Sequence, residues 1–175
     1  MRISEAAKIL KNKGVGILPT DTIYGLVGSA LAQKTVERIY KLRKRNLKKP
    51  MIILIGSFKD LEKFKIKLDK RLKKILTKFW PGPVSIILPC SFKEFSYLHR
   101  GGKSLAFRLP KNKNLIKILL KTGPLVAPSA NPEGLKPAID IAEAKKYFKN
   151  KVDFYINKGK IKSKPSIILE VKRLP

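Results

Sequence analysis

The sequence is poor in the residues that build disulfides, metal clusters and covalent catalytic pairs. It has one cysteine, Cys90, and one histidine, His99, among 175 residues. A single cysteine excludes an internal disulfide, and no group of His, Cys and carboxylate residues has the spacing of metal ligands. We expect Cys90 to serve packing and His99, beside Arg100, to lie at the surface. An enzyme of this composition would act by positioning and charge stabilisation, not by covalent catalysis.

Long apolar runs are also missing. None approaches the roughly 20 residues that a helix needs to cross a bilayer. Residues 1–14 alternate apolar and charged side chains, unlike a secretory signal. We therefore expect a cytoplasmic protein without a membrane partner. The length of 175 residues and the 43% share of hydrophobic residues are typical of one folded domain, which we expect to span residues 1–175.

Acidic residues are few beside the basic ones. The chain has 12 Asp and Glu against 40 Lys and Arg, a formal net charge of +28. Such a field attracts polyanions, for example a nucleic acid or a nucleoside triphosphate. The lysines are, however, scattered along the whole chain, as on a generally lysine-rich surface. The charge by itself favours an anionic partner but identifies none.

Hydrophobic periodicity predicts an α/β fold. Helices are expected at residues 3–10, 35–44, 61–79 (two helices broken near Asp69), 115–120 and 141–148. Strands are expected at residues 15–18, 51–55, 84–88, 105–109, 125–127, 154–156 and 167–171. Because the strands are short, uneven and interrupted by proline, they favour a single-domain mixed sheet flanked by helices over a regular parallel sheet.

Polar residues follow the first predicted strand. Thr20 and Thr22 lie just past its end, where open α/β sheets bind ligands. Their hydroxyls both donate and accept, which suits a small amino acid or a phosphate. Threonine and aspartate are equally common in turns, where they bond to their own backbone. Both interpretations of this stretch stay open at this point.

Three further stretches carry polar groups that a core does not require. Arg43–Pro50 packs five cations into eight residues, of which only one or two can face one ligand. Arg108 lies in an apolar strand on the same face as Ala106, and burying it requires an anionic partner. That partner is either a structural carboxylate or carbonyl, or a substrate carboxylate. Ser129 and Asn131 follow another strand, in a loop that suits phosphate or sugar but is also ordinary loop sequence.

Taken in order, these stretches resemble the YrdC/TsaC family over nearly the whole chain. The matching segments are LPTDTIYGL, R-x-R-x-x-x-K-P-M, WPGPVSIIL, LAFRLP, APSANPEG and PSII. The resemblance implies a twisted α/β fold with a basic concave cavity. It also implies L-threonylcarbamoyladenylate synthesis from L-threonine, bicarbonate or CO2, and ATP with Mg2+. The product would pass to a threonylcarbamoyl transferase complex that modifies tRNA.

The resemblance also implies roles for individual residues. Threonine contacts would come from Thr20, Arg108, Ala127 and Ser166. ATP contacts would come from Arg43, Arg45, Lys49, Ser104, Ser129 and Asn131. The chain departs from the usual family pattern at Arg43, Asn46, Lys49 and Leu54. Arg173 stands near the place of an ATP-contacting arginine that many family members carry somewhat further on.

Two other functions compete with the synthase. A basic module that binds double-stranded RNA or tRNA would explain the +28 charge and the basic segment 61–79. It would not explain Thr20, Arg108 and Ser129 in family register, and no aromatic cluster lies on a basic strand to stack bases. A paralogue with the same fold and another substrate is the second competitor. The SAN and WPGP runs favour the synthase over that paralogue.

Overall fold

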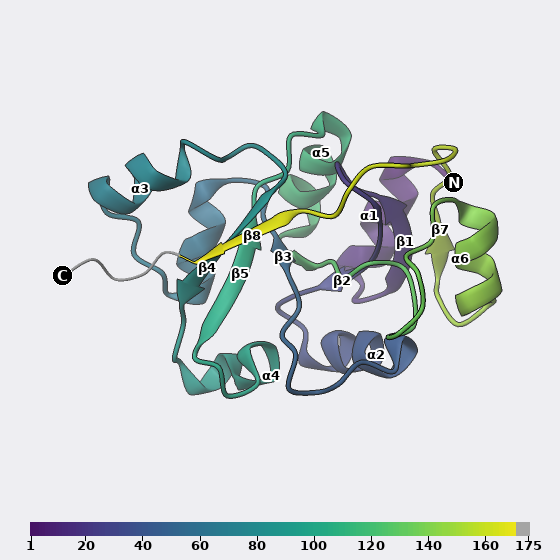
Figure 1. The fold of residues 1–175 in the computed structure, drawn as a ribbon, viewed down its shortest axis with the longest axis horizontal. Coiled ribbons are helices and arrows are strands. Elements are labelled where there is room, and N and C mark those ends of the chain that lie inside the picture. Colours follow the sequence, from purple (N-terminus) through teal and green to yellow (C-terminus); the bar gives the residue numbers. More distant parts are fainter. Residues whose placement is uncertain (171–175) are drawn as a thin grey trace.

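The computed structural model describes residues 1–170, which form one mixed sheet with helices on both faces (Figure 1). The helices are α1 (Ile3–Lys11), α2 (Gln33–Arg43), α3 (Lys70–Leu76), α4 (Ser96–His99), α5 (Lys113–Thr122) and α6 (Ile141–Phe148), with 3-10 turns η1 (Phe58–Phe64) and η2 (Lys93–Phe95). The strands are β1 (Val15–Pro19), β2 (Tyr24–Ser29), β3 (Ile53–Leu54), β4 (Val84–Pro89), β5 (Ser104–Arg108), β6 (Leu125–Val126), β7 (Phe154–Tyr155) and β8 (Ile167–Glu170). Their order in the sheet is β7-β1-β2-β6-β3-β5-β4-β8.

The pairing confirms the predicted mixed sheet. β1 and β2 form an antiparallel hairpin, whereas β3 runs parallel to β5 and β8 runs parallel to β4. None of the helices within residues 1–170 is long and apolar enough to cross a membrane.

Alternate residues of a strand point to opposite faces of the sheet, as its two-residue period requires, and two separate cores lie on these faces. In β1, Val15 and Ile17 join the larger core, which also holds residues of α2 and α6. Leu18 joins the smaller core beneath α1 and α5. In β5, Leu105 and Phe107 are likewise buried in the larger core. The alternate residues of β5 therefore point to the face that carries α1 and α5.

Strand β2 is the main element that periodicity did not predict. Its sequence, YGLVGS, has no clear alternation of apolar and polar residues because almost the whole strand is buried. Glycine is required on this hairpin by close packing. A Cβ on Gly28 would lie 2.5 Å from Thr35, and a Cβ on Gly16 would lie 2.2 Å from the Phe154 ring.

The basic segment 61–79 is partly as predicted. The break near Asp69 is confirmed, because the Asp69 side chain accepts a hydrogen bond from the Leu72 backbone at the start of α3. The first half is a 3-10 turn and not an α-helix. Asp60 accepts bonds from the Gly56 and Ser57 backbones and so ties this short turn to the end of β3. Lys65, at φ 59°, then ends the turn.

The single histidine and single cysteine are both buried. The expectation of a surface His99 is wrong: the residue is 5% exposed, in the short helix α4 that periodicity did not predict. Its Nδ1 accepts a hydrogen bond from the Gly101 backbone, so the ring closes the turn after α4. Cys90 is buried as expected of a packing residue.

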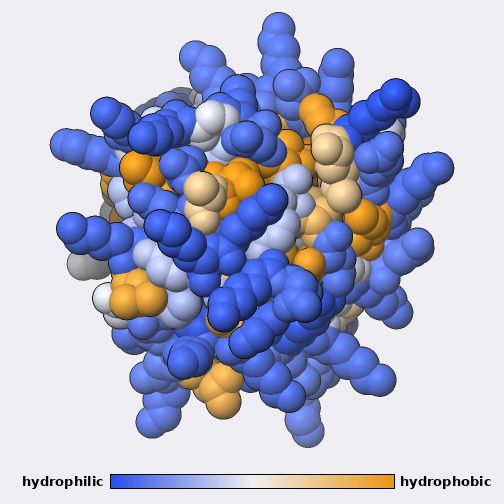
Figure 2. Space-filling model, turned by 90° about the vertical axis from the view of Figure 1, so that its right-hand side faces the viewer, coloured by the Kyte–Doolittle hydropathy of each residue, from blue (hydrophilic) through white to orange (hydrophobic). Residues whose placement is uncertain are grey.

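The segment between β7 and β8 crosses the molecule. These two strands lie at opposite edges of the sheet, so residues 156–166 must span its width (Figure 1). The buried Tyr24 hydroxyl anchors the segment, donating to the Gly159 carbonyl at 2.8 Å and accepting from the Lys158 backbone at 2.9 Å. Hydrophilic side chains project from most of the face shown in Figure 2, with smaller hydrophobic patches between them.

Candidate functional site

A cavity of about 540 Å³ lies over the part of the sheet that contains β5 and β8. Ser104, Ala106 and Arg108 project into it from one face of β5, as alternation predicts. Pro165 and Ser166 border it from the crossing segment 156–166. The other lining residues are Thr20, Thr22, Ile23, Gly25, Arg43, Arg45, Pro50, Met51, Ile52, Ile87, Gly102, Ala127, Pro128, Ser129, Pro137 and Ile168.

The cavity gathers most of the residues that the family resemblance singled out. Eight of them line it: Thr20, Arg43, Arg45, Ser104, Arg108, Ala127, Ser129 and Ser166. Lys49 and Asn131 are not among the lining residues. Within residues 1–170 the lining contains three arginines and no carboxylate. Arg173 lies outside the described residues.

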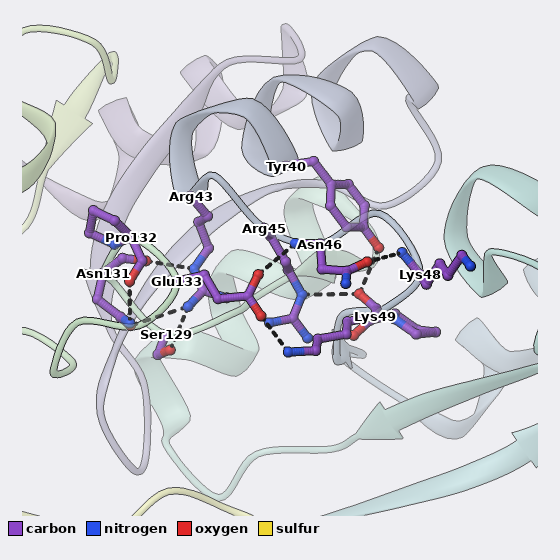
Figure 3. A network of polar contacts seen from close by, with 11 residues as sticks. Tyr40, Arg43, Arg45, Asn46, Lys48, Lys49, Ser129, Asn131, Pro132 and Glu133 are labelled. Carbon is purple, nitrogen blue, oxygen red and sulfur yellow. Dashed lines mark hydrogen bonds and ion pairs between the residues drawn. The ribbon is translucent and has the colours of Figure 1, made fainter.

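Arg43 joins the end of α2 to the loop after β6 (Figure 3). It is 4% exposed, and its Nε donates to the Asn131 carbonyl at 2.7 Å. The Nη2 of Arg43 donates to the Ser129 hydroxyl at 3.2 Å and to Asn131 Oδ1 at 3.3 Å. Burial, with the neighbouring Arg45, lowers the pKa of Arg43 to about 10. The guanidinium is thus still charged at neutral pH and borders the cavity.

Asn131 shapes the loop that carries Ser129. Its side-chain nitrogen donates to the Pro132 carbonyl at 2.9 Å and to the Leu135 carbonyl at 2.7 Å. All the polar atoms of this amide are therefore used within the protein. Asn131 accordingly positions Arg43 and Ser129 at the cavity, although it does not line the cavity itself.

Arg45 and Lys49 lie in the loop after α2 (Figure 3). Arg45 borders the cavity and donates to the carbonyls of Lys49 and Pro50, at 3.0 and 2.9 Å. The Lys49 ammonium instead forms an ion pair with Glu133 at 2.6 Å and is 59% exposed. Hydrogen bonds from Lys49 and from the Asn46 backbone hold the pKa of Glu133 below its usual range. Of the five cations in this stretch, Arg43 and Arg45 border the cavity.

Thr20 makes the turn that the sequence left open and also lies at the cavity. Its hydroxyl donates to the Ile23 carbonyl at 2.7 Å and accepts from the Thr22 and Ile23 backbones, each at 3.2 Å. This is the expected turn chemistry. Both threonines nevertheless line the cavity and are less than 10% exposed. The turn therefore fixes the two side chains at the cavity wall.

Arg108 has a structural carboxylate as its partner. Its Nη2 lies 3.1 Å from Asp21 Oδ1, and its Nη1 donates to the Thr22 hydroxyl at 3.3 Å. Burial lowers the pKa of Arg108, and the charge of Asp21 opposes that shift. Sequence reasoning did not assign a role to Asp21. The available signal was a carboxylate between two threonines at a strand end, with an arginine in an apolar strand elsewhere in the chain.

Ser166 comes to the cavity from the crossing segment 156–166. The Ser166 hydroxyl lies 3.1 Å from that of Ser85 on β4, which holds the end of the crossing segment beside the sheet.

No group of three or more His, Cys, Asp or Glu residues within positions 1–170 is arranged to hold a metal ion. These residues do not form a protein cage for Mg2+.

The fold and the site define an α/β protein whose cavity is lined in part by hydroxyls and guanidinium groups, a donor set for anionic small molecules. The family model Sua5_yciO_yrdC, described as "Telomere recombination", matches residues 8–174. The chain therefore belongs to the Sua5/YciO/YrdC family, which confirms the resemblance in its motifs.

Named relatives and a solved structure agree with this assignment. Threonylcarbamoyl-AMP synthase of Pyrococcus abyssi is 30% identical over 159 residues, covering 90% of this chain and 47% of that protein. Threonylcarbamoyl-AMP synthase of Hahella chejuensis is 29% identical, covering 95% of this chain and 91% of that protein. The crystal structure of P. abyssi Sua5 complexed with L-threonine superposes with a TM-score of 0.89 at 28% identity, over 99% of this chain and 52% of that chain. The chain spans about half the length of the P. abyssi protein.

Proposed function

We propose that this chain forms threonylcarbamoyl-AMP and pyrophosphate from L-threonine, bicarbonate or CO2, and ATP. The threonine amine would attack CO2 and lose a proton, which gives a carbamate. A carbamate oxygen would then form a bond to the α-phosphorus of ATP, while the bond between that phosphorus and the pyrophosphate oxygen breaks. The reaction thus joins anions and needs alignment and charge neutralisation.

The observation that carries this proposal is the cavity that gathers the predicted residues. Thr20, Arg108 and Ser166, with the Ala127 backbone, would bind threonine, and the guanidinium would hold its carboxylate. Support for this substrate comes from the P. abyssi Sua5 structure, which was solved with L-threonine.

The other end of the cavity suits ATP. Arg43 and Arg45 would neutralise phosphate charge, and the hydroxyls of Ser104 and Ser129 would add hydrogen bonds. Mg2+ is proposed only as an ion carried on the phosphates of ATP. Lys49 could contribute by leaving Glu133, since its ammonium is largely exposed. These groups bind and align the reactants, and none of them acts as a nucleophile.

The direct test is pyrophosphate release by the purified protein with ATP and Mg2+, with and without threonine and bicarbonate. We expect release only when both are present, together with threonylcarbamoyl-AMP in the mass spectrum. L-Serine should compete poorly if the threonine methyl group is recognised. ATP binding without release under any of these conditions would favour the paralogue with another substrate. Absence of ATP binding would contradict the proposal and favour an RNA-binding module.

Partners beyond the three substrates are a separate part of this proposal. The net charge of +28 and the exposed cations of α3 support affinity for tRNA or double-stranded RNA. A threonylcarbamoyl transferase complex would take over the product, and a cytoplasmic location would place the chain beside tRNA. Pull-down with purified transferase proteins and fractionation of cells would test these two points.

A further inference from the structure

Asp21 and Arg108 lie in a wall between two cavities. Arg108 borders the 540 Å³ cavity described above, whereas Asp21 borders a neighbouring cleft of about 480 Å³. Thr20 borders both. The carboxylate is therefore placed beside the guanidinium but on the side of the second cleft, and it is not among the groups that line the proposed substrate cavity.

The ion pair is buried but poorly satisfied. The side chains of Arg108 and Asp21 are only 4% and 8% exposed, at a separation of 3.1 Å. Within residues 1–170, neither carboxylate oxygen of Asp21 has a hydrogen-bond donor in good geometry, and Nε of Arg108 has no acceptor. Buried polar groups normally use their hydrogen-bonding capacity. Asp21 and Arg108 leave much of their hydrogen-bonding capacity unused, which points to a functional constraint on their placement.

The ion pair makes the charge at the proposed threonine end of the cavity, around Arg108, differ from the charge at the proposed ATP end, around Arg43. Within residues 1–170, the Arg43 guanidinium bonds to Ser129 and Asn131 and forms no ion pair. Glu133, whose charge acts on Arg43, is itself paired with Lys49, so the charge of Arg43 is left unpaired at the proposed ATP end. At the other end, Asp21 balances Arg108. A single carboxylate can then bind the guanidinium through its fork, while the attraction for a highly charged triphosphate is reduced. Without Asp21, the Arg108 guanidinium would no longer be held in this wall and would also attract phosphate groups.

We propose that Asp21 is a positioning residue that holds the Arg108 guanidinium in this wall and neutralises it, so that the threonine end of the cavity selects one amino-acid carboxylate over phosphate groups. The inference rests on the proposed function, since it concerns the threonine subsite of that reaction. Asp21 acts through Arg108 and does not touch the substrate.

The experiment is titration of L-threonine, and separately of ATP with Mg2+, into the wild-type protein and the variant Asp21→Asn. Asparagine keeps the shape and removes the charge. We expect threonine binding to weaken by about tenfold or more, while ATP binding changes by less than about threefold. Inorganic phosphate should compete with threonine in Asp21→Asn but not in the wild type. Asp21→Glu, which restores the charge, should recover part of the threonine affinity and suppress the competition by phosphate.

Asp60→Asn is the matched control. Asp60 is also a buried carboxylate in an ion pair, with Lys63 at 2.6 Å, but it lines neither cavity. This variant should keep the wild-type affinity for both ligands even if it unfolds at a lower temperature. Unfolding temperatures of all variants separate loss of folding from loss of positioning.

The outcomes distinguish this inference from the proposed function. If the wild type does not bind threonine, the proposed function fails and the inference fails with it. If the wild type binds threonine and Asp21→Asn binds it equally well or more tightly, only the inference is overturned. A parallel loss of threonine and ATP affinity with a lower unfolding temperature would make Asp21 a folding residue and would also overturn it.

Discussion

Arg43 and Asn131 are joined by two hydrogen bonds, from Nε to the backbone oxygen at 2.7 Å and from Nη2 to Oδ1 at 3.3 Å. They connect the end of α2 to the loop that carries Ser129 at the cavity. Because the same guanidinium borders the cavity, folding and binding depend on one side chain. The network also explains why a residue that does not line the cavity belongs to the site.

Replacing Arg43 by methionine should therefore affect stability and ATP binding together. The change leaves the Asn131 oxygens without donors, and we expect the free energy of unfolding to fall by about 1–3 kcal/mol. ATP affinity should fall by about tenfold or more, since a charge-assisted contact to phosphate is lost. Urea unfolding and ATP titration measure the two effects. Lys41→Met, an exposed change on the same helix, is the control, and unchanged ATP affinity in Arg43→Met would contradict the assigned role.

Arg108→Ala should remove the response to threonine. We expect kcat/KM for threonine in pyrophosphate release to fall at least about 100-fold, which corresponds to roughly 2.7 kcal/mol of lost transition-state stabilisation. Arg108→Lys keeps the charge without the planar fork and should lose about tenfold. Affinities for ATP and for RNA should stay close to wild type in both variants. An equal loss of threonine-dependent activity and RNA affinity would contradict the separation of these two functions.

The ion pair between Arg38 and Asp153 predicts a pH-dependent contribution to stability. Hydrogen bonds from Arg38 hold the pKa of Asp153 below its ordinary value of 3.8. A depressed carboxylate pKa stabilises the fold fully above the unfolded pKa, and that contribution is lost as the pH falls through the folded pKa. Asp153→Asn should thus lower the free energy of unfolding at pH 7, by on the order of 1 kcal/mol because both side chains are partly exposed.

Urea unfolding at several pH values tests this prediction. The difference between wild type and Asp153→Asn should shrink as the pH falls below 3.8. Glu37→Gln makes the same change in net charge. Within residues 1–170 the Glu37 side chain has only Gln33 as a hydrogen-bond partner, so this variant should show a smaller difference at pH 7. A difference for Asp153→Asn that stays constant with pH would show that the ion pair does not account for its effect.

Charge reversal on α3 should weaken RNA binding without affecting synthesis. Lys70, Lys73 and Lys74 are exposed on this short helix. Replacing all three by glutamate should raise the Kd for tRNA by about tenfold or more and flatten its dependence on salt. Pyrophosphate release should stay within about twofold of wild type. The control variant carries the same charge change at Lys8, Lys11 and Lys117, on α1 and α5. An equal loss of RNA affinity in this control would mean that only the net charge of the protein matters.

The local pattern of the sequence was enough for the fold class, whereas most of the candidate site residues came from the resemblance of the motifs to a known family. Alternation of apolar residues placed Ala106 and Arg108 on one face of a strand, and both line the cavity. Periodicity did not find β2, because a strand buried on both faces shows no alternation. It also placed His99 at the surface, since nothing local shows that a four-residue helix will bury the ring.

The sequence by itself determined the alternation of helices and strands and the excess of positive charge, because these depend on residue type and local spacing. The resemblance of its motifs to a known family named most of the candidate residues that line the cavity. Only the tertiary structure decided how those residues are paired. Asp21 meets Arg108 across 87 positions of the chain, and Lys49 turns away from the cavity to Glu133. Such pairings depend on how strands from distant parts of the chain register in one sheet, and local pattern carries no information about that register.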